Sequence, residues 1–340
     1  MPKKLVTLAL QGGGSHGAFT WGVLDRLLED DRIEIEGISG ASAGAINAVV
    51  LAHGYTAGGR EGGRQALEAF WRSVVKKAAF NSVPGDWSQP MAAGSQHSNA
   101  AVNALVFLAR FFSPYQLNPF NVNPLRDILA DQVDFERIRS DCSIKLFIAA
   151  TQVSTGRLRL FPTQQLTLNA LLASACIPSL NHTVEIEGEA YWDGGLTANP
   201  PIRPLLYKCD ARDILVVLLD PCRRPAIPAT ADEISQRLTE ISFSSALSAE
   251  LQGIALAKQE AESAPFSLGR LDRKLRRLNL HLIQPQDGAS RSSALSKLDA
   301  RSSVINALRD EGRNRADTWL KENFRLIGAR SSFTLAGHLY

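Results

Sequence analysis

The sequence Gly-Ala-Ser-Ala-Gly at residues 40–44 places a serine where a predicted strand, residues 33–38, meets a predicted buried helix, residues 43–53. A strand that turns at once into a helix forces its corner residue into strained backbone dihedrals. Small residues on both sides of that corner let the strand and the helix approach without a side-chain clash. Because the corner side chain then points out of the fold, above the start of the helix, Ser42 is the candidate nucleophile. The two flanking glycines support this turn: Gly40 and Gly44.

A second glycine-rich stretch, residues 11–17, lies between a predicted strand at 5–10 and a helix at 18–29 with apolar residues at helical spacing. It matches the G-x-G-x-x-G pattern that cradles a pyrophosphate in dinucleotide-binding folds. That fold also needs an acidic residue at the end of the second strand, and here Ile38-Ser39-Gly40 stands there. Consecutive glycines also leave backbone N–H groups open to a developing negative charge, and this interpretation is favoured. The predicted oxyanion hole and its supporting residues are Gly12, Gly13 and Gly14, with His16 and Gly17.

Asp193 is the candidate general base, and it is followed directly by Gly194 and Gly195. Two short strands around a Glu-Gly turn, within residues 183–192, are predicted to lead into it. Taken alone, Asp-Gly-Gly is typical of a simple tight turn. Beside a nucleophile and an oxyanion loop, a carboxylate fixed at a strand end becomes the group that accepts the serine proton. An aspartate with a pKa near ~3.9 is a weak base for this purpose, so the site needs a raised aspartate pKa or a strong oxyanion hole.

Composition restricts the function further. The chain of 340 residues has 45% hydrophobic and 21% charged residues, as ordinary globular proteins do, and its net charge of +3 is too small to indicate nucleic-acid binding. Its four cysteines show no C-x-x-C spacing, so neither a zinc site nor a disulfide framework is expected, and we expect no metal and no cofactor. No apolar run reaches the ~18 residues of a membrane span. We therefore expect a cytoplasmic protein, with at most peripheral membrane contact.

The remaining chain predicts alternating strands and helices, which indicates parallel strands packed under helices. Two segments leave alternatives open. Residues 100–112 form either a lid over an apolar substrate site or a helix packed on the core, and residues 270–277 carry five basic residues that either attract anionic head groups or form a solvated helix face. The other predictions are a loop at 54–64, helices at 65–79, 124–129, 167–176, 231–262 and 294–324, and strands at 143–150, 157–161, 213–219 and 278–283.

The three motifs, in this order, resemble those of the patatin-like phospholipase family over roughly residues 5–220, and residues 118–262 resemble a bacterial subgroup with its own C-terminal extension. The resemblance implies an α/β, three-layer patatin-like fold with a mostly parallel central sheet between helices. It implies a catalytic domain at 1–220 and a mainly helical extension at 221–340 packed on it. It also implies hydrolysis of acyl esters, often of lipids, by a Ser42–Asp193 dyad without a catalytic histidine. The glycine-loop amides would then form the oxyanion hole.

His16 departs from the family pattern, which has arginine or lysine at this place in the glycine loop. A basic residue there would order the loop or hold a lipid phosphate, so a preference for phospholipids over other acyl esters is left open.

Three other functions are compatible with the residues. The first is an α/β-hydrolase whose triad is Ser42, Asp193 and His281, although that fold normally places its nucleophile after several strands. The second is a nucleotide-binding regulator that uses the glycine loop. The third is a lipid-binding module without activity. The sequence gives neither the acyl chain length nor the head group, and it leaves the oligomeric state open.

Overall fold

The computed structural model describes residues 3–81, 111–221, 227–263, 269–286 and 294–333. Within these ranges eight strands form one sheet in the order β5-β6-β3-β2-β1-β7-β8, with β4 also paired to β3. The strands are β1 (Lys4–Leu10), β2 (Ile33–Gly40), β3 (Lys145–Gln152), β4 (Leu158–Pro162), β5 (Val184–Ile186), β6 (Glu189–Asp193), β7 (Asp213–Val217) and β8 (Asn279–Ile283).

The centre of the sheet is parallel. Strand β1 pairs in parallel with β2 and with β7, while β2 pairs in parallel with β3 and β7 with β8. The antiparallel pairs, β3–β4, β3–β6 and β5–β6, all lie on one side of the sheet. Parallel strands need helical crossovers, and the strand-helix alternation of the chain supplies them. The predicted mostly parallel sheet is confirmed.

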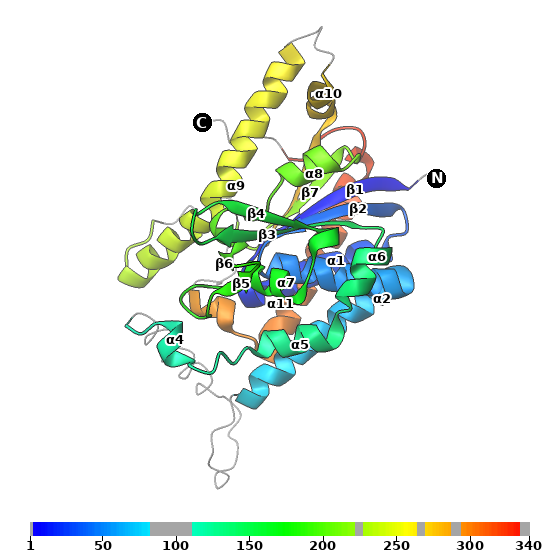
Figure 1. The fold of residues 1–340 in the computed structure, drawn as a ribbon. Helices are drawn as coiled ribbons and strands as arrows, with labels where there is room; N and C mark the ends of the chain where they lie inside the picture. Colours follow the sequence, from blue (N-terminus) through cyan, green and yellow to red (C-terminus); the bar gives the residue numbers. More distant parts are fainter. Residues whose placement is uncertain (1–2, 82–110, 222–226, 264–268, 287–293, 334–340) are drawn as a thin grey trace.

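Helices cover both faces of this sheet, which gives the predicted three layers (Figure 1). One face packs against α1 (Gly17–Glu29), α2 (Ala43–Asn81), α5 (Pro124–Gln132), α6 (Phe135–Asp141), α7 (Leu168–Ser174) and α11 (Ser302–Asn323). The other face packs against α8 (Arg203–Lys208), α9 (Ala231–Ser263) and α10 (Arg270–Arg277). The remaining short helical segments of the described residues are η1 (Gly14–His16), α4 (Pro114–Leu117), η2 (Thr163–Gln165), η3 (Gly194–Leu196), η4 (Ala294–Leu298) and η5 (Phe324–Leu326).

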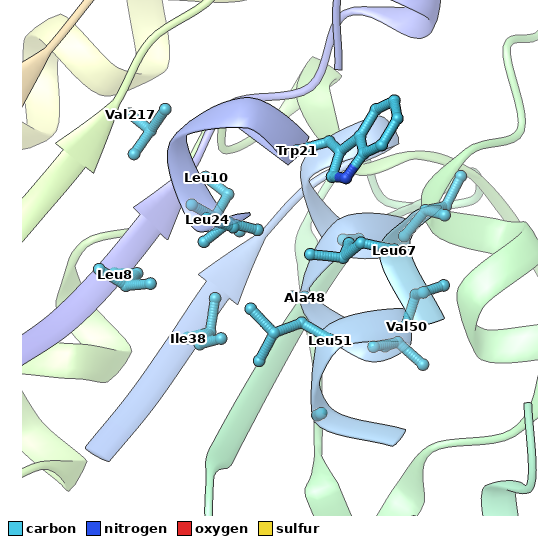
Figure 2. Close-up of a cluster of buried hydrophobic side chains, with 14 of the residues drawn as sticks. Leu8, Leu10, Trp21, Leu24, Ile38, Ala48, Val50, Leu51, Leu67 and Val217 are labelled. Carbon is cyan, nitrogen blue, oxygen red and sulfur yellow. The ribbon is translucent and has the colours of Figure 1, made fainter. Parts of the chain in front are cut away.

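Alternate residues of the central strands enter two different cores. In β1, Leu8 and Leu10 face the α1/α2 side, whereas Ala9 between them faces the α8/α9 side. Figure 2 shows Leu8 and Leu10 beside Ile38 of β2 and Val217 of β7. The helix side chains that meet them include Trp21, Leu24, Leu51 and Leu67. Because both faces of the strands are buried, β1 and β7 are apolar throughout most of their length.

The predicted loop at residues 54–64 is wrong. These residues are helical, and only Gly58 and Gly59 leave helical dihedrals, so that two helices meet at a kink within α2. The glycines serve close packing of these two helices, because a Cβ on Gly54 would lie 2.2 Å from the carbonyl oxygen of Gly62. A glycine-rich sequence is typical of a loop, but here it lets one helix cross the next at backbone distance.

The predicted helix at 294–324 is divided into η4 and α11, with residues 299–301 outside both, and the other predicted strands and helices are present with bounds shifted by a few residues. Of the candidate lid at 100–112, residues 100–110 lie outside the described residues. Beyond residue 220, the chain contributes β8 to the sheet edge next to β7 and packs α11 against α1. Among the described residues, no helix is both long and apolar enough to cross a membrane.

Candidate active site

Ser42 occupies the corner between β2 and α2, as the sequence predicts. Its φ of 52° lies in the left-handed region, which is strained for a residue other than glycine. The following Gly44 is required by space, because a Cβ there would lie 2.2 Å from the carbonyl oxygen of Leu10. Gly40 is similarly tight, since a Cβ on it would lie 2.7 Å from the Ala45 nitrogen. Strand β1 and helix α2 therefore meet at backbone distance, and the serine is held at their junction.

A buried helix end fixes the backbone of this corner. The Ser42 N–H donates to Ser174 twice, to its carbonyl oxygen at 3.1 Å and to its hydroxyl at 3.0 Å. Ser174 is the last residue of α7 and is fully buried. Sequence reasoning missed it because a serine at the end of an apolar helix carries no recognisable signal. Two additional contacts to one residue stabilise a corner whose dihedrals are unfavourable.

Asp193 ends β6 and is 1% exposed. Its carboxylate accepts a hydrogen bond of 2.7 Å from the Gly195 N–H. Gly194, the residue between them, lies against the β3 backbone, because a Cβ there would be 2.1 Å from the carbonyl oxygen of Ala149. Burial raises the pKa of Asp193 to about 6, while hydrogen bonds from the Gly195 N–H and the Ser42 side chain lower it. The structure thus brings Asp193 and Ser42 together, although they are far apart in the chain.

The glycine loop lies directly against the serine corner. A Cβ on Gly12 would be 2.7 Å from the Cβ of Ser42, so only glycine leaves room for this approach. The Gly12 N–H is not open, however, because it donates to Oδ1 of Asn199 at 2.7 Å. Within the described ranges, the N–H groups of Gly13 and Gly14 have no protein acceptor. Of the three amides expected in the oxyanion hole, one therefore holds the loop in place.

Asn47 joins the far end of the glycine loop to α2. Its side-chain amide donates to the carbonyl oxygens of Gly17 and Ala43, each at 3.0 Å, and its oxygen accepts from Trp71 Nε1 at 3.0 Å. All of this bonding is buried, where hydrogen bonds are stronger and geometry is better defined than in water. Gly17, the first residue of α1, is thereby tied to the helix that follows Ser42.

His16 is 2% exposed, and its Nε2 lies 3.0 Å from the hydroxyl of Ser296 in η4. The same segment crosses the loop at Gly14, where a Cβ would be 2.2 Å from the carbonyl oxygen of Lys297. Lys297 in turn pairs with Asp220, just beyond β7, at 2.9 Å. His16 is thus directed at the protein interior, toward η4. Residues from late in the chain close one side of the glycine loop.

His281 lies away from this site. Its Nε2 is 2.9 Å from Oδ1 of Asp213, and its Nδ1 is 2.9 Å from the hydroxyl of Ser332. Asp213 begins β7, whereas Ser42 follows the carboxyl end of β2, two strands away in a parallel arrangement. The His281–Asp213 pair and Ser42 therefore lie at opposite ends of the parallel strands. The Ser42–Asp193–His281 triad of the α/β-hydrolase alternative is not assembled.

Among the described residues, no group of three or more His, Cys, Asp or Glu side chains is arranged to hold a metal ion. The site is instead built from a serine, a buried carboxylate and backbone amides. These are the parts of acyl transfer by a covalent intermediate: a nucleophile, a proton acceptor and donors for a developing negative charge.

The family model for patatin-like phospholipase matches residues 8–206, which include the glycine loop, the serine corner and Asp193. No match was found among curated protein sequences. VipD from Legionella pneumophila has a structure that is 15% identical in sequence, with a TM-score of 0.40, and the match covers 99% of this chain and 73% of that one. A chain of the heterodimeric ExoU–SpcU complex from the type III secretion system of Pseudomonas aeruginosa is also 15% identical, with a TM-score of 0.37. That match covers 95% of this chain and spans about half of the other, 52%. The match to the family model covers more than half of the sequence, and the chain therefore belongs to the patatin-like phospholipase family of lipid acyl hydrolases.

Proposed function

We propose that this protein hydrolyses lipid acyl esters by a Ser42–Asp193 dyad. The observation that carries the proposal is the contact of the strained Ser42 with a buried carboxylate whose pKa is raised to about 6. A base is most effective when its pKa approaches the working pH. Burial thus supplies the raised pKa that a dyad without histidine requires.

In the first step, the Ser42 oxygen attacks the ester carbonyl carbon while its proton passes to Asp193. The carbonyl electron pair moves onto oxygen, and the N–H groups of Gly13 and Gly14 stabilise that charge. The intermediate then collapses, and the leaving alcohol takes the proton from Asp193. An acyl group remains bonded to Ser42.

In the second step, water attacks the acyl carbon and gives its proton to Asp193. Collapse of this intermediate breaks the bond to the Ser42 oxygen, which recovers the proton, and the fatty acid leaves. In this proposal the Gly12 N–H remains bonded to Asn199 and keeps the loop at the serine. Its part is to position the two donors that follow it.

Exposed apolar residues of η3 and α9 support a lipid substrate that is reached at a membrane surface. Leu196 in η3, next to the Asp193 turn, is 39% exposed. Helix α9 packs near this turn through Phe243, and its first half exposes Ile234, Leu238 and Ile241 along one stripe. The stripe lies on the side of α9 opposite Phe243, away from the Asp193 turn, and gives the protein peripheral contact with lipid.

The test is hydrolysis of p-nitrophenyl esters of several chain lengths and of phosphatidylcholine, with labelling of the active serine by a fluorophosphonate. Ser42→Ala is expected to lower kcat by about 10⁴-fold and to abolish labelling. The matched control Ser140→Ala changes an exposed serine on α6 and keeps both signals. His281→Ala retains turnover below its melting temperature, whereas a triad enzyme loses it. Full activity of Ser42→Ala would exclude the mechanism, and absence of any turnover by wild type would favour a binding protein.

A further inference from the structure

Helix α10 carries an unusual concentration of positive charge on one face. Arg270, Arg273 and Arg277 are all exposed and stand at helical positions i, i+3 and i+7, which places them side by side. Within the described ranges, no acidic side chain pairs with any of the three. Like charges at such spacings destabilise a helix by a few tenths of a kcal/mol per pair. An uncompensated row of arginines therefore needs a reason other than the stability of the helix.

These arginines line a hollow of about 250 Å³ at the base of α10. Arg212 and Lys274 also line it, so the described lining has five cationic side chains against the single carboxylate of Asp210. A solvated helix face would spread its charges into water. Here basic residues of two separate chain segments, Arg212 and α10, line one concave space.

The floor of the hollow is rigidly held. Lys274 Nζ donates to the carbonyl oxygens of Leu206 and Cys209, at 3.2 and 2.6 Å, and so joins α10 to the end of α8. The loop before β7 is held by Glu36, whose carboxylate accepts from the N–H groups of Asp210 and Ala211. Arg212, at the end of this loop, therefore keeps a fixed position relative to α10. A preformed site loses less conformational entropy when it binds a ligand.

The hollow is distinct from the active site. Arg212 precedes β7, whose first residue Asp213 pairs with Val6 of β1, whereas the far end Val217 pairs with Leu10 beside the glycine loop. Five residue steps, or ~16 Å, separate Arg212 from Val217. A ligand in the hollow therefore cannot be the ester that Ser42 attacks. Figure 1 shows α10 beside the upper end of α9, at the edge of the molecule.

We propose that this hollow binds a phosphate-bearing anion. A guanidinium presents paired N–H donors that match phosphate oxygens, and arginine keeps its charge at all relevant pH values. Five cations within one small volume favour an anion with two or more negative charges. The volume suits a pyrophosphate or a phosphomonoester head group rather than a long polyanion. The inference does not depend on the role of Ser42.

The experiment measures pyrophosphate binding by titration calorimetry on the full chain, at constant ionic strength. Replacing two of the exposed arginines, Arg273→Gln with Arg277→Gln, is expected to raise Kd by about tenfold or more, because charge-assisted hydrogen bonds are lost. The matched control is Arg325→Gln with Arg330→Gln, which removes the same charge from two exposed arginines elsewhere. The control pair leaves Kd within about twofold, the effect expected of a surface charge.

A second arm distinguishes a free anion from a lipid head group. Co-sedimentation is measured with phosphatidylcholine vesicles, with and without phosphatidic acid, for the same variants on a Ser42→Ala background that prevents hydrolysis. If wild type binds pyrophosphate, and only the Arg273→Gln/Arg277→Gln variant loses this binding, the result supports a free ligand. Binding confined to vesicles with phosphatidic acid, and again lost only in the α10 pair, supports the same site filled by a head group. The proposal is wrong if the α10 double variant and the control double variant bind both probes equally well. It is also wrong if wild type binds neither probe.

Discussion

Two buried aspartates at strand ends, Asp193 and Asp213, have opposite surroundings. Oδ1 of Asp213 accepts from His281, Asn279 and the Gly328 N–H, at distances of 2.9, 3.1 and 2.9 Å. Asp193 accepts from the Gly195 N–H and contacts the Ser42 side chain. A carboxylate with several donors is an anchor that joins distant parts of a fold, whereas a poorly satisfied one retains basicity. The number of hydrogen-bond donors thus distinguishes Asp193, the proposed base, from the structural Asp213.

The sharpest test of this comparison makes the same change at both aspartates. Asp193→Asn removes the proposed base and is expected to lower kcat by about 10⁴-fold. Asp213→Asn leaves kcat within about twofold but lowers the free energy of unfolding by about 2 kcal/mol, because buried donors lose their charged acceptor. Ester hydrolysis and urea unfolding measure the two effects. The comparison fails if Asp213→Asn removes activity from folded protein, or if Asp193→Asn leaves it intact.

The pH dependence provides a second test. With a pKa of about 6, Asp193 becomes protonated as the pH falls through that value, and kcat is expected to fall about tenfold for each further unit. Folding raises this pKa from 3.8, so the native state binds the proton more tightly than the unfolded chain does. The resulting stability is fully present below the unfolded pKa and is lost as the pH rises through about 6.

This linkage amounts to about 3 kcal/mol between the two pKa values, and it disappears in Asp193→Asn. Urea unfolding of wild type and variant over a pH series measures it. Parallel stability curves for the two proteins would mean that burial does not raise the pKa of Asp193. The base would then resemble an ordinary anchoring carboxylate.

The smallest expected effect concerns the contact from late in the chain. Ser296→Ala removes the hydroxyl beside His16 Nε2 and loosens the glycine loop, so we expect kcat to fall about three- to tenfold with KM nearly unchanged. The free energy of unfolding falls by about 1 kcal/mol. Ser303→Ala, an exposed serine at the start of α11, is the control and changes neither quantity. An unchanged kcat in Ser296→Ala would show that η4 packs on the loop without positioning it.

Much of the fold and of the site could be predicted from residues that act locally. The corner at Ser42 needs glycines at fixed spacing, and the alternation of strands and helices indicates a parallel sheet. The partners that fix the site could not be predicted in this way. Asn199 and Ser174 reach the loop and the corner from distant segments, and nothing local marks them. The division at residue 220 stays a prediction.

The glycines near residue 58 show a second limit of structure prediction from sequence. Glycine has the same composition signal whether it lies in a loop or lets two backbones approach, so Gly54 and Gly62 predicted a loop where helices cross. Only the tertiary structure separates these uses.

The packing of η4 on the glycine loop has a consequence for synthesis of the protein. A ribosome exposes Ser42 and Asp193 well before it adds residues 294–298, which hold His16 and Gly14. Helix α11, which covers α1 and contributes Trp319 and Leu320 to the main core, emerges later still. A nascent chain therefore contains Ser42 and Asp193 but lacks the contacts that residues 294–298 make with the glycine loop. If Ser42 and Asp193 act as proposed, we expect hydrolysis to reach its full rate only once residues 294–298 have folded onto the glycine loop.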